Sequence, residues 1–233
     1  MDIKLEKKQI LRDSYHQITT KQNADKKLTS EQMTALKNIE IAQHQGKQKF
    51  LLYGVTGSGK TQIYIEMALK ARALGKQALI LVPEIVLTGQ LVTSFKEYFT
   101  DDVAVIHSRL SVGERNDTFW RIRTKQIGII IGARSALFAP FEDLGLIVMD
   151  EEHDSSYKQD ESPRYHSHDI IEKMAEIYHA TLIMGSATPS LESYYKAQIG
   201  EYVLLKMPNR IDNLPLPYIE GVDMREELRM GNR

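Results

Sequence analysis

One eight-residue stretch limits what this chain can fold into more than any other feature, the run Gly54-Val55-Thr56-Gly57-Ser58-Gly59-Lys60-Thr61. It satisfies every fixed position of the pattern G-x-x-x-x-G-K-[ST], in which backbone N–H groups surround phosphate oxygens. A short apolar run at 50–53 precedes it, and a run without Pro or Gly follows it as far as residue 74. A strand, a Gly-rich loop and a helix form the context that this pattern requires. The sequence therefore predicts a phosphate-binding loop.

The chemistry of this loop follows from its residue types. Glycines let the backbone turn its N–H groups inward, and the N-terminus of the next helix adds unsatisfied donors and the positive end of its dipole. Lys60 can reach the β- and γ-phosphates of a nucleotide, and the Thr61 hydroxyl can ligate Mg²⁺.

Strands and helices alternate along the rest of the chain. Continuous apolar runs, typical of strands covered on both faces, lie at 78–82, 103–106, 127–131, 146–149 and 181–184. Helices are expected at 87–99 and 169–178, and two more begin with capping-box spacing at Thr29/Gln32 and Ser111/Glu114. This alternation predicts an α/β fold, a parallel sheet with helices on both faces.

Polar loops follow three of the expected strands. Asp150 ends the apolar run 146–149 and could hold Mg²⁺, while the adjacent Glu151 could orient and deprotonate an attacking water. The run 185–189 offers Ser186 and Thr188, small hydroxyl side chains in a loop that could shift when the γ-phosphate leaves. Because functional loops of parallel sheets lie at the carboxyl ends of the strands, we expect these loops to meet the phosphate loop.

Composition excludes several classes of protein. Hydrophobic residues make up 42% of the 233 residues, enough for a substantial core, and a net charge of −1 means that any nucleic-acid contact needs a local patch. The absence of Cys excludes disulfides and thiolate metal sites within this chain. There is no signal-peptide pattern and no apolar run of membrane-spanning length, so we expect a cytoplasmic protein without membrane contact.

The three polar loops together resemble those of superfamily 2 helicases of the DEAH type. Longer segments are similar to the first motor lobe of the bacterial replication-restart helicases of the primosome, namely those at 82–85, 107–108, 113–115, 132–140, 150–154 and 185–190. The resemblance runs from about Tyr15 to the C-terminus. It implies a RecA-like P-loop NTPase lobe from a 3′–5′ helicase. That helicase would couple ATP hydrolysis, with Mg²⁺, to translocation on single-stranded DNA at stalled forks.

The resemblance also implies a role for each matching residue. It makes Gln32 the reader of adenine, whereas spacing alone favours a helix cap. It assigns Lys60, Thr61 and Asp150 to the phosphates and Mg²⁺, Glu151 to the catalytic base, and His153 to the link between hydrolysis and DNA. The implied DNA-binding or coupling residues are Pro83, Glu84, Arg134, Ser135, Tyr157, Tyr165, His166, Ser186 and Thr188.

The stretch 157–166 resembles the aromatic-rich loop that couples DNA binding to hydrolysis in these helicases. It contains few aliphatic residues, which predicts that Tyr157 and Tyr165 do not anchor the core. An ordinary solvated loop is the alternative, although aromatic and basic side chains together suit stacking on single strands. A metal site at His166, His168 and Asp169 lacks a complete signature.

Three segments are expected along the chain. Residues 1–27 resemble the tail of a winged-helix region with a linker, 28–205 form the ATP-binding lobe, and 206–233 lead toward a second lobe. We expect neither a second lobe nor a zinc-binding cysteine-rich region within these 233 residues, so the isolated chain is expected to be nearly inactive. The alternatives are a lone lobe that binds ATP and DNA without turnover, and a small-molecule kinase, which would not need Glu151. The resemblance further implies other primosome proteins and single-strand-binding protein as partners.

Overall fold

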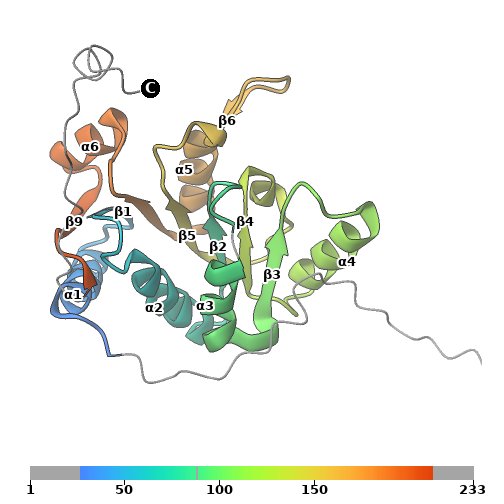
Figure 1. Cartoon of the computed structure of the whole chain (residues 1–233), viewed down its shortest axis with the longest axis horizontal. Helices are drawn as coiled ribbons and strands as arrows, with labels where there is room; N and C mark the ends of the chain where they lie inside the picture. The colour runs from blue at the N-terminus through green and yellow to red at the C-terminus, as the bar shows by residue number, and fades with distance from the viewer. Residues whose placement is uncertain (1–26, 88, 212–233) are drawn as a thin grey trace, which may run out of the picture.

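The computed structural model describes residues 27–87 and 89–211, so most of the expected segments 1–27 and 206–233 lies outside the described residues. Seven strands form one sheet in the order β3-β4-β2-β5-β8-β1-β9, and each neighbouring pair is parallel (Figure 1). They are β1 (Lys49–Gly54), β2 (Gln77–Leu81), β3 (Val103–Ile106), β4 (Ile129–Gly132), β5 (Leu144–Asp150), β8 (Thr181–Ser186) and β9 (Val203–Met207). The predicted parallel α/β fold is confirmed.

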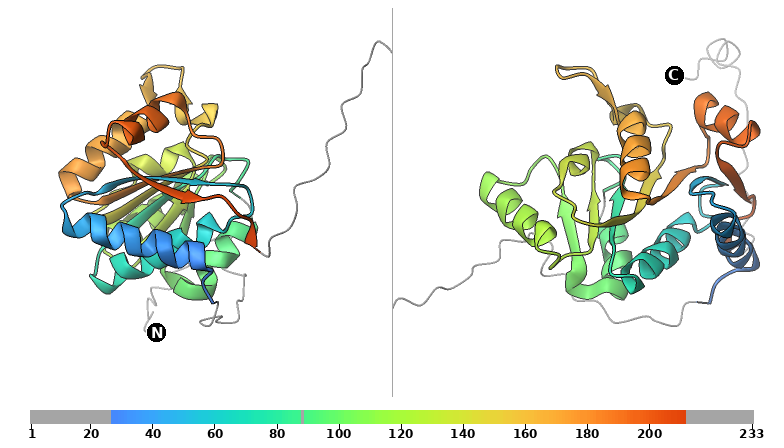
Figure 2. Two further views of the ribbon diagram at one scale, coloured as in Figure 1. Left: turned by 90° about the vertical axis from the view of Figure 1, so that its left-hand side faces the viewer. Right: turned by 180° about the vertical axis from the view of Figure 1, so that it is seen from behind.

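Helices cover both faces of this sheet, as Figure 2 shows from two further directions. One face packs against α1 (Ser30–His44), α2 (Lys60–Ala73) and α3 (Gly89–Phe99). The other packs against α4 (Val112–Arg123), α5 (Ser167–Tyr178) and α6 (Leu191–Gln198). Three short 3₁₀ turns connect elements, namely η1 (Thr100–Asp102), η2 (Arg134–Phe138) and η3 (Ser155–Tyr157). A small antiparallel hairpin of β6 (Lys158–Gln159) and β7 (Tyr165–His166) projects beyond α5 (Figure 1).

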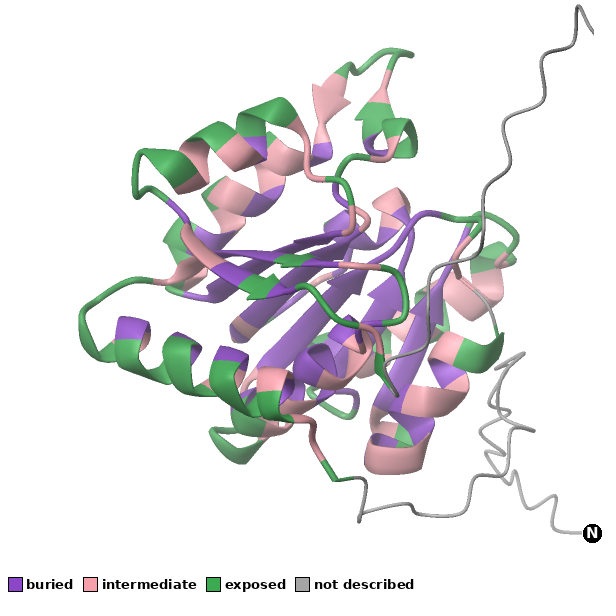
Figure 3. Ribbon diagram, turned by 60° about the vertical axis from the view of Figure 1, so that its left-hand side comes forward, coloured by how far each residue is buried: buried purple, intermediate pink, exposed green. Residues whose placement is uncertain are grey.

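The core has two halves, one on each face of the sheet. Because side chains alternate along a strand, Phe50 and Leu52 pack in the half formed by α1 to α3, whereas Leu51 packs in the other. Figure 3 shows the buried strands between helices whose outer faces are exposed. Burial on both faces is the reason that these strands are continuous apolar runs in the sequence.

Both predicted capping boxes are present. Thr29 caps α1 with Gln32, and Ser111 caps α4 with Glu114. The sequence reasoning did not anticipate α6 or β9, and β9 continues to Met207. Among the described residues, no helix combines the length and the apolar character needed to cross a membrane.

Strand order brings the functional loops together. In the middle of the sheet β8 lies between β5 and β1. The acidic loop after β5, the Ser-Ala-Thr loop after β8 and the phosphate loop after β1 therefore end at the same edge.

Candidate functional site

The phosphate loop joins β1 to α2 with two residues in the left-handed conformation. Gly57 has φ +82° and Gly59 has φ +85°, a region that glycine enters without strain. A Cβ atom on Gly59 would also collide with the Nε2 atom of Gln32. The loop therefore needs glycine at residue 59 for its backbone conformation and for the approach of α1.

Lys60 lies at the start of α2 with its ammonium directed into the loop. Its Nζ atom donates to the Gly54 carbonyl oxygen at 2.9 Å and lies 4.0 Å from Oε1 of Glu151. Only 8% of the residue is exposed. Glu151 itself has φ +45°, a strained conformation for a residue with a side chain, and such strain clusters at functional sites. The predicted cation and the predicted base are therefore neighbours.

Asp150 ends β5 in a buried position held by two tyrosines. The Tyr64 hydroxyl donates to its Oδ1 atom at 2.7 Å, and the Tyr157 hydroxyl donates to its backbone oxygen at 2.7 Å. Burial raises the pKa of the Asp150 carboxyl above its usual value, although the Tyr64 hydrogen bond and Lys60 act in the opposite direction. The sequence reasoning did not identify Tyr64.

Gln32 caps α1 and also contacts the phosphate loop. Its side-chain oxygen accepts from Thr29 N at 2.8 Å, which completes the cap, while its Nε2 atom donates to the Gly59 carbonyl oxygen at 3.1 Å. The cap predicted from spacing is confirmed. The same amide touches the phosphate loop, so a role at the nucleotide would require it to exchange one or both of these bonds.

Glu152 is the most heavily hydrogen-bonded carboxylate of this region. It accepts from the backbone N–H and hydroxyl of Ser190, from the Ser193 hydroxyl and from His168 Nε2, at 2.7 to 2.9 Å. Burial alone would raise its pKa, but these hydrogen bonds outweigh burial and lower it. Glu152 thus ties the acidic loop to α5 and α6, a structural function that the sequence did not reveal.

The Ser-Ala-Thr loop meets the acidic loop at His153. Its Nδ1 atom lies 2.8 Å from the Ser186 hydroxyl and its Nε2 atom 3.4 Å from the Thr188 hydroxyl. Nδ1 is also 3.7 Å from Oε2 of Glu151. His153 therefore bridges the expected base and the loop after β8.

A groove of about 560 Å³ gathers several of the predicted DNA-binding residues, since Glu84, Arg134, Ser135 and Tyr165 all line it. Arg134 donates to the backbone oxygens of Ser156 and Lys158 in the segment that leads into the hairpin. The guanidinium lies 5.9 Å from the centre of the Tyr165 ring. Of the remaining residues in this set, Pro83 is buried.

One expectation about the aromatic stretch is wrong. Tyr157 is 1% exposed and belongs to the core, because its ring packs on the face formed by α5 while its hydroxyl reaches Asp150. Tyr165 is half-buried and contacts Phe138 edge-on at 5.5 Å between ring centres. His166 lines a different cavity, with its Nδ1 atom 2.9 Å from Nδ1 of His168. The stretch therefore does not form one surface.

Residues expected to begin a linker also contact the phosphate loop. The Val55 N–H donates to Met207 O at 3.2 Å, and the Ile211 N–H donates to Gly57 O at 3.0 Å. Arg210 Nε donates to Thr56 O at 3.1 Å. The chain that leaves β9 thus runs along the loop, which no sequence motif indicated.

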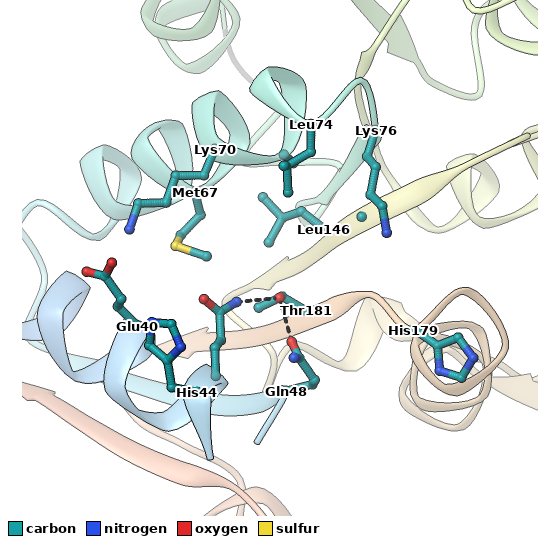
Figure 4. A pocket seen from close by; sticks show the side chains of 13 residues that line it. Glu40, His44, Gln48, Met67, Lys70, Leu74, Lys76, Leu146, His179 and Thr181 are labelled. Atoms are coloured by element: carbon teal, nitrogen blue, oxygen red, sulfur yellow. Dashed lines mark hydrogen bonds between the residues drawn. The ribbon is translucent and has the colours of Figure 1, made fainter. Parts of the chain in front are cut away.

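Another hollow, of about 440 Å³, lies at the opposite edge of the sheet (Figure 4). Glu40, His44, Lys70 and Lys76 line it, and a chain of hydrogen bonds crosses it from Gln43 through Thr181 to Gln48. It contains none of the residues predicted from the motifs, and it lies at the amino ends of the strands. We therefore do not assign the nucleotide to it.

The family model described as "Type III restriction enzyme, res subunit", abbreviated ResIII, matches residues 25–191, well over half of the chain. The chain belongs to the ResIII family. The ResIII match contains the phosphate loop, the acidic loop and the Ser-Ala-Thr loop, which are the segments that meet at one edge of the sheet.

Curated relatives are similar over most of this ResIII chain. It is 49% identical over 226 residues to the replication restart protein PriA of Bacillus subtilis, which covers 97% of this chain and 28% of that protein. The PriA of Synechocystis is 46% identical over 194 residues, 81% of this chain and 23% of its own length. The resemblance to replication-restart helicases is confirmed, and the chain spans about a quarter of the length of these relatives.

Solved structures share the fold. RecG bound to a three-way DNA junction has a TM-score of 0.59 at 23% identity, covering 89% of this chain and 27% of that one. The RecA-like helicase motor fold implied by the motifs is therefore confirmed.

Proposed function

We propose that this chain is the first motor lobe of a replication-restart DNA helicase, which hydrolyses ATP to move 3′–5′ along single-stranded DNA at stalled forks. One observation carries the proposal: the Lys60 ammonium, in the phosphate loop, lies 4.0 Å from Glu151 in the acidic loop. A phosphate-binding cation and a base for water then lie within the dimensions of one triphosphate.

The residues of this edge fit Mg·ATP in their chemistry. The Ser58 hydroxyl is buried inside the phosphate loop and has no hydrogen-bond partner among the residues that the structure describes, which leaves it available to a ligand. Thr61 and Asp150 would hold Mg²⁺, since hydroxyl and carboxylate oxygens are the ligands it prefers. Bound Mg²⁺ would neutralise charge on the phosphates.

Four side chains of this site would then have separate roles in nucleotide binding and hydrolysis. Lys60 would exchange its bond to the Gly54 oxygen for a phosphate oxygen. Glu151 would orient a water and accept its proton. His153, between Glu151 and the loop after β8, would transmit the loss of the γ-phosphate toward the DNA side. Gln32 would read adenine from its position against Gly59.

The DNA strand would follow the groove beside the hairpin. Tyr165 offers an aromatic ring next to the Arg134 guanidinium, a combination that suits stacking and phosphate contact. Glu84 and Ser135 would border the strand, whereas the buried Pro83 would act through the adjacent Glu84 and Tyr157 through Asp150. DNA, single-strand-binding protein and other primosome proteins in the cytoplasm are the proposed partners, and the boundaries 1–27, 28–205 and 206–233 are the proposed segments.

Steady-state ATPase of the full-length protein, with and without single-stranded DNA, tests the proposal. We expect stimulation by DNA, and we expect Lys60→Ala to abolish it because the ammonium stabilises charge on the γ-phosphate. Lys70→Ala, a change at an exposed lysine on the same helix, is the matched control and should leave turnover unchanged. Full DNA-stimulated turnover by Lys60→Ala would refute the proposal.

A further inference from the structure

We propose that Tyr64 is a positioning residue that aims the Asp150 carboxylate at Mg²⁺. The inference rests on the proposed function, because it assumes that Asp150 holds the metal. Tyr64 lies one turn after Lys60 on α2, and it is fully buried. Its hydroxyl donates to Oδ1 of Asp150 at 2.7 Å.

The hydroxyl of Tyr64 lies in a space that the neighbouring strand leaves for it. Gly185 lies in β8 and pairs with Asp150 of β5. A Cβ atom on Gly185 would overlap the Tyr64 hydroxyl. The same Cβ would lie 3.2 Å from Oδ1 of Asp150. Glycine at this place thus permits the contact between the hydroxyl and the carboxylate, which any larger residue would disturb.

Tyr64 holds the Asp150 carboxylate, and Tyr157 holds the Asp150 backbone. Tyr157 donates to the Asp150 carbonyl oxygen at 2.7 Å, so the main chain at the end of β5 is fixed independently of the side chain. Among the tyrosines that the structure describes, Tyr64 is therefore the one whose hydroxyl bonds to the carboxylate itself. Partners of this kind orient metal ligands and are worth about 10- to 100-fold in metal affinity.

Tyr64 and the proposed Mg²⁺ ligand Thr61 lie on the same helix, α2. The first turn of α2 carries Thr61, the other proposed Mg²⁺ ligand, and its second turn carries Tyr64. A rigid helix therefore sets the spacing between the metal-binding hydroxyl and the donor that orients the metal-binding carboxylate. A Phe at residue 64 would fill the core equally well but would release the carboxylate.

The test is the Mg²⁺ dependence of nucleotide binding by this chain, with a fluorescent N-methylanthraniloyl derivative of ATP as the probe. Tyr64→Phe should raise the Mg²⁺ concentration for half-maximal binding about tenfold or more, and it should leave binding in EDTA unchanged. Tyr98→Phe is the matched control, because that hydroxyl bonds to Gln62 of the same helix at 3.2 Å, away from Asp150.

The outcomes are distinct. An unchanged Mg²⁺ dependence in Tyr64→Phe, beside Mg²⁺-dependent binding by the wild type, overturns this inference and leaves the proposed function standing. Binding by the wild type that ignores Mg²⁺ overturns both. In the Asp150→Asn background, Tyr64→Phe should add no further shift, because Tyr64 acts through Asp150.

A measurement on the unmutated fold covers the case in which Tyr64→Phe does not fold. In the wild type labelled with ¹³C at tyrosine Cζ, the Tyr64 resonance is the one that moves in Asp150→Asn and is still present in Tyr157→Phe, because the Tyr157 hydroxyl also bonds to residue 150. It should shift with Mg²⁺ and nucleotide together but not with nucleotide in EDTA. A resonance that is insensitive to Mg²⁺ contradicts the inference.

Discussion

Replacing Glu152 by alanine should be among the most destabilising single changes in this chain. The carboxylate is 1% exposed and accepts four hydrogen bonds, from His168, from Ser193 and twice from Ser190. Hydrogen bonds to a charged group contribute about 1.5–3 kcal/mol each, but they are not additive within one cluster. Loss of the carboxylate leaves buried donors of Ser190, Ser193 and His168 without this acceptor, and each unsatisfied buried donor costs about 1–3 kcal/mol, so we take about 3–5 kcal/mol for the cluster.

The assay is thermal unfolding and urea unfolding at pH 7, each followed by circular dichroism. A loss of about 3–5 kcal/mol in a protein of this size lowers the thermal midpoint by roughly 6–20 °C. Glu192→Ala, a change at an exposed carboxylate on the same helix as Ser193, is the matched control and should stay within about 0.5 kcal/mol. A cost below about 1 kcal/mol for Glu152→Ala would show that water replaces the four donors, and our account of the cluster would be wrong.

The same cluster predicts a dependence on pH. Hydrogen bonds lower the pKa of Glu152 in the folded chain below its value in the unfolded chain. The stability that it contributes is therefore present above the unfolded pKa and is lost as the pH falls through the folded one. The free energies of unfolding of wild type and Glu152→Ala should differ most above about pH 4.3, the ordinary pKa of a glutamate. The two values should become equal in acid.

Three further predictions concern the proposed motor activity. In the full-length protein, Glu151→Gln should slow hydrolysis about 10²- to 10⁴-fold with nucleotide binding retained, because the amide cannot accept a proton; weakened binding with retained turnover would contradict this. Tyr165→Ala should reduce DNA stimulation of the ATPase and leave the thermal midpoint unchanged. Tyr157→Ala should lower the free energy of unfolding by about 3–5 kcal/mol because it empties a core position. Equal thermal midpoints of the two variants would refute the distinction. A polypeptide limited to these 233 residues should bind Mg·ATP weakly and show little DNA-stimulated turnover. The absence of an arginine finger alone lowers turnover about 10³-fold or more. Turnover well above that of a Glu151→Gln control would refute this prediction.

The sequence by itself determined the features that depend on neighbouring residues. The phosphate loop could be predicted because its glycines, its lysine and the helix after it are contiguous, and their conformations follow from local backbone sterics. The two capping boxes span only three residues each, and both are present. The parallel sheet was predictable because burial on both faces leaves continuous apolar runs.

Only the tertiary structure decided which distant side chains meet. Glu152 finds its partners 16 to 41 residues away on α5 and α6, and Tyr64 reaches Asp150 across 86 residues. Tyr157 was predicted not to anchor the core because few aliphatic residues surround it in the sequence, yet the chain returns through η3 and carries its ring into the core. A polar side chain is stable in the interior only where its hydrogen bonds are satisfied, and its partners depend on strand order and helix packing rather than on the residues beside it in the chain.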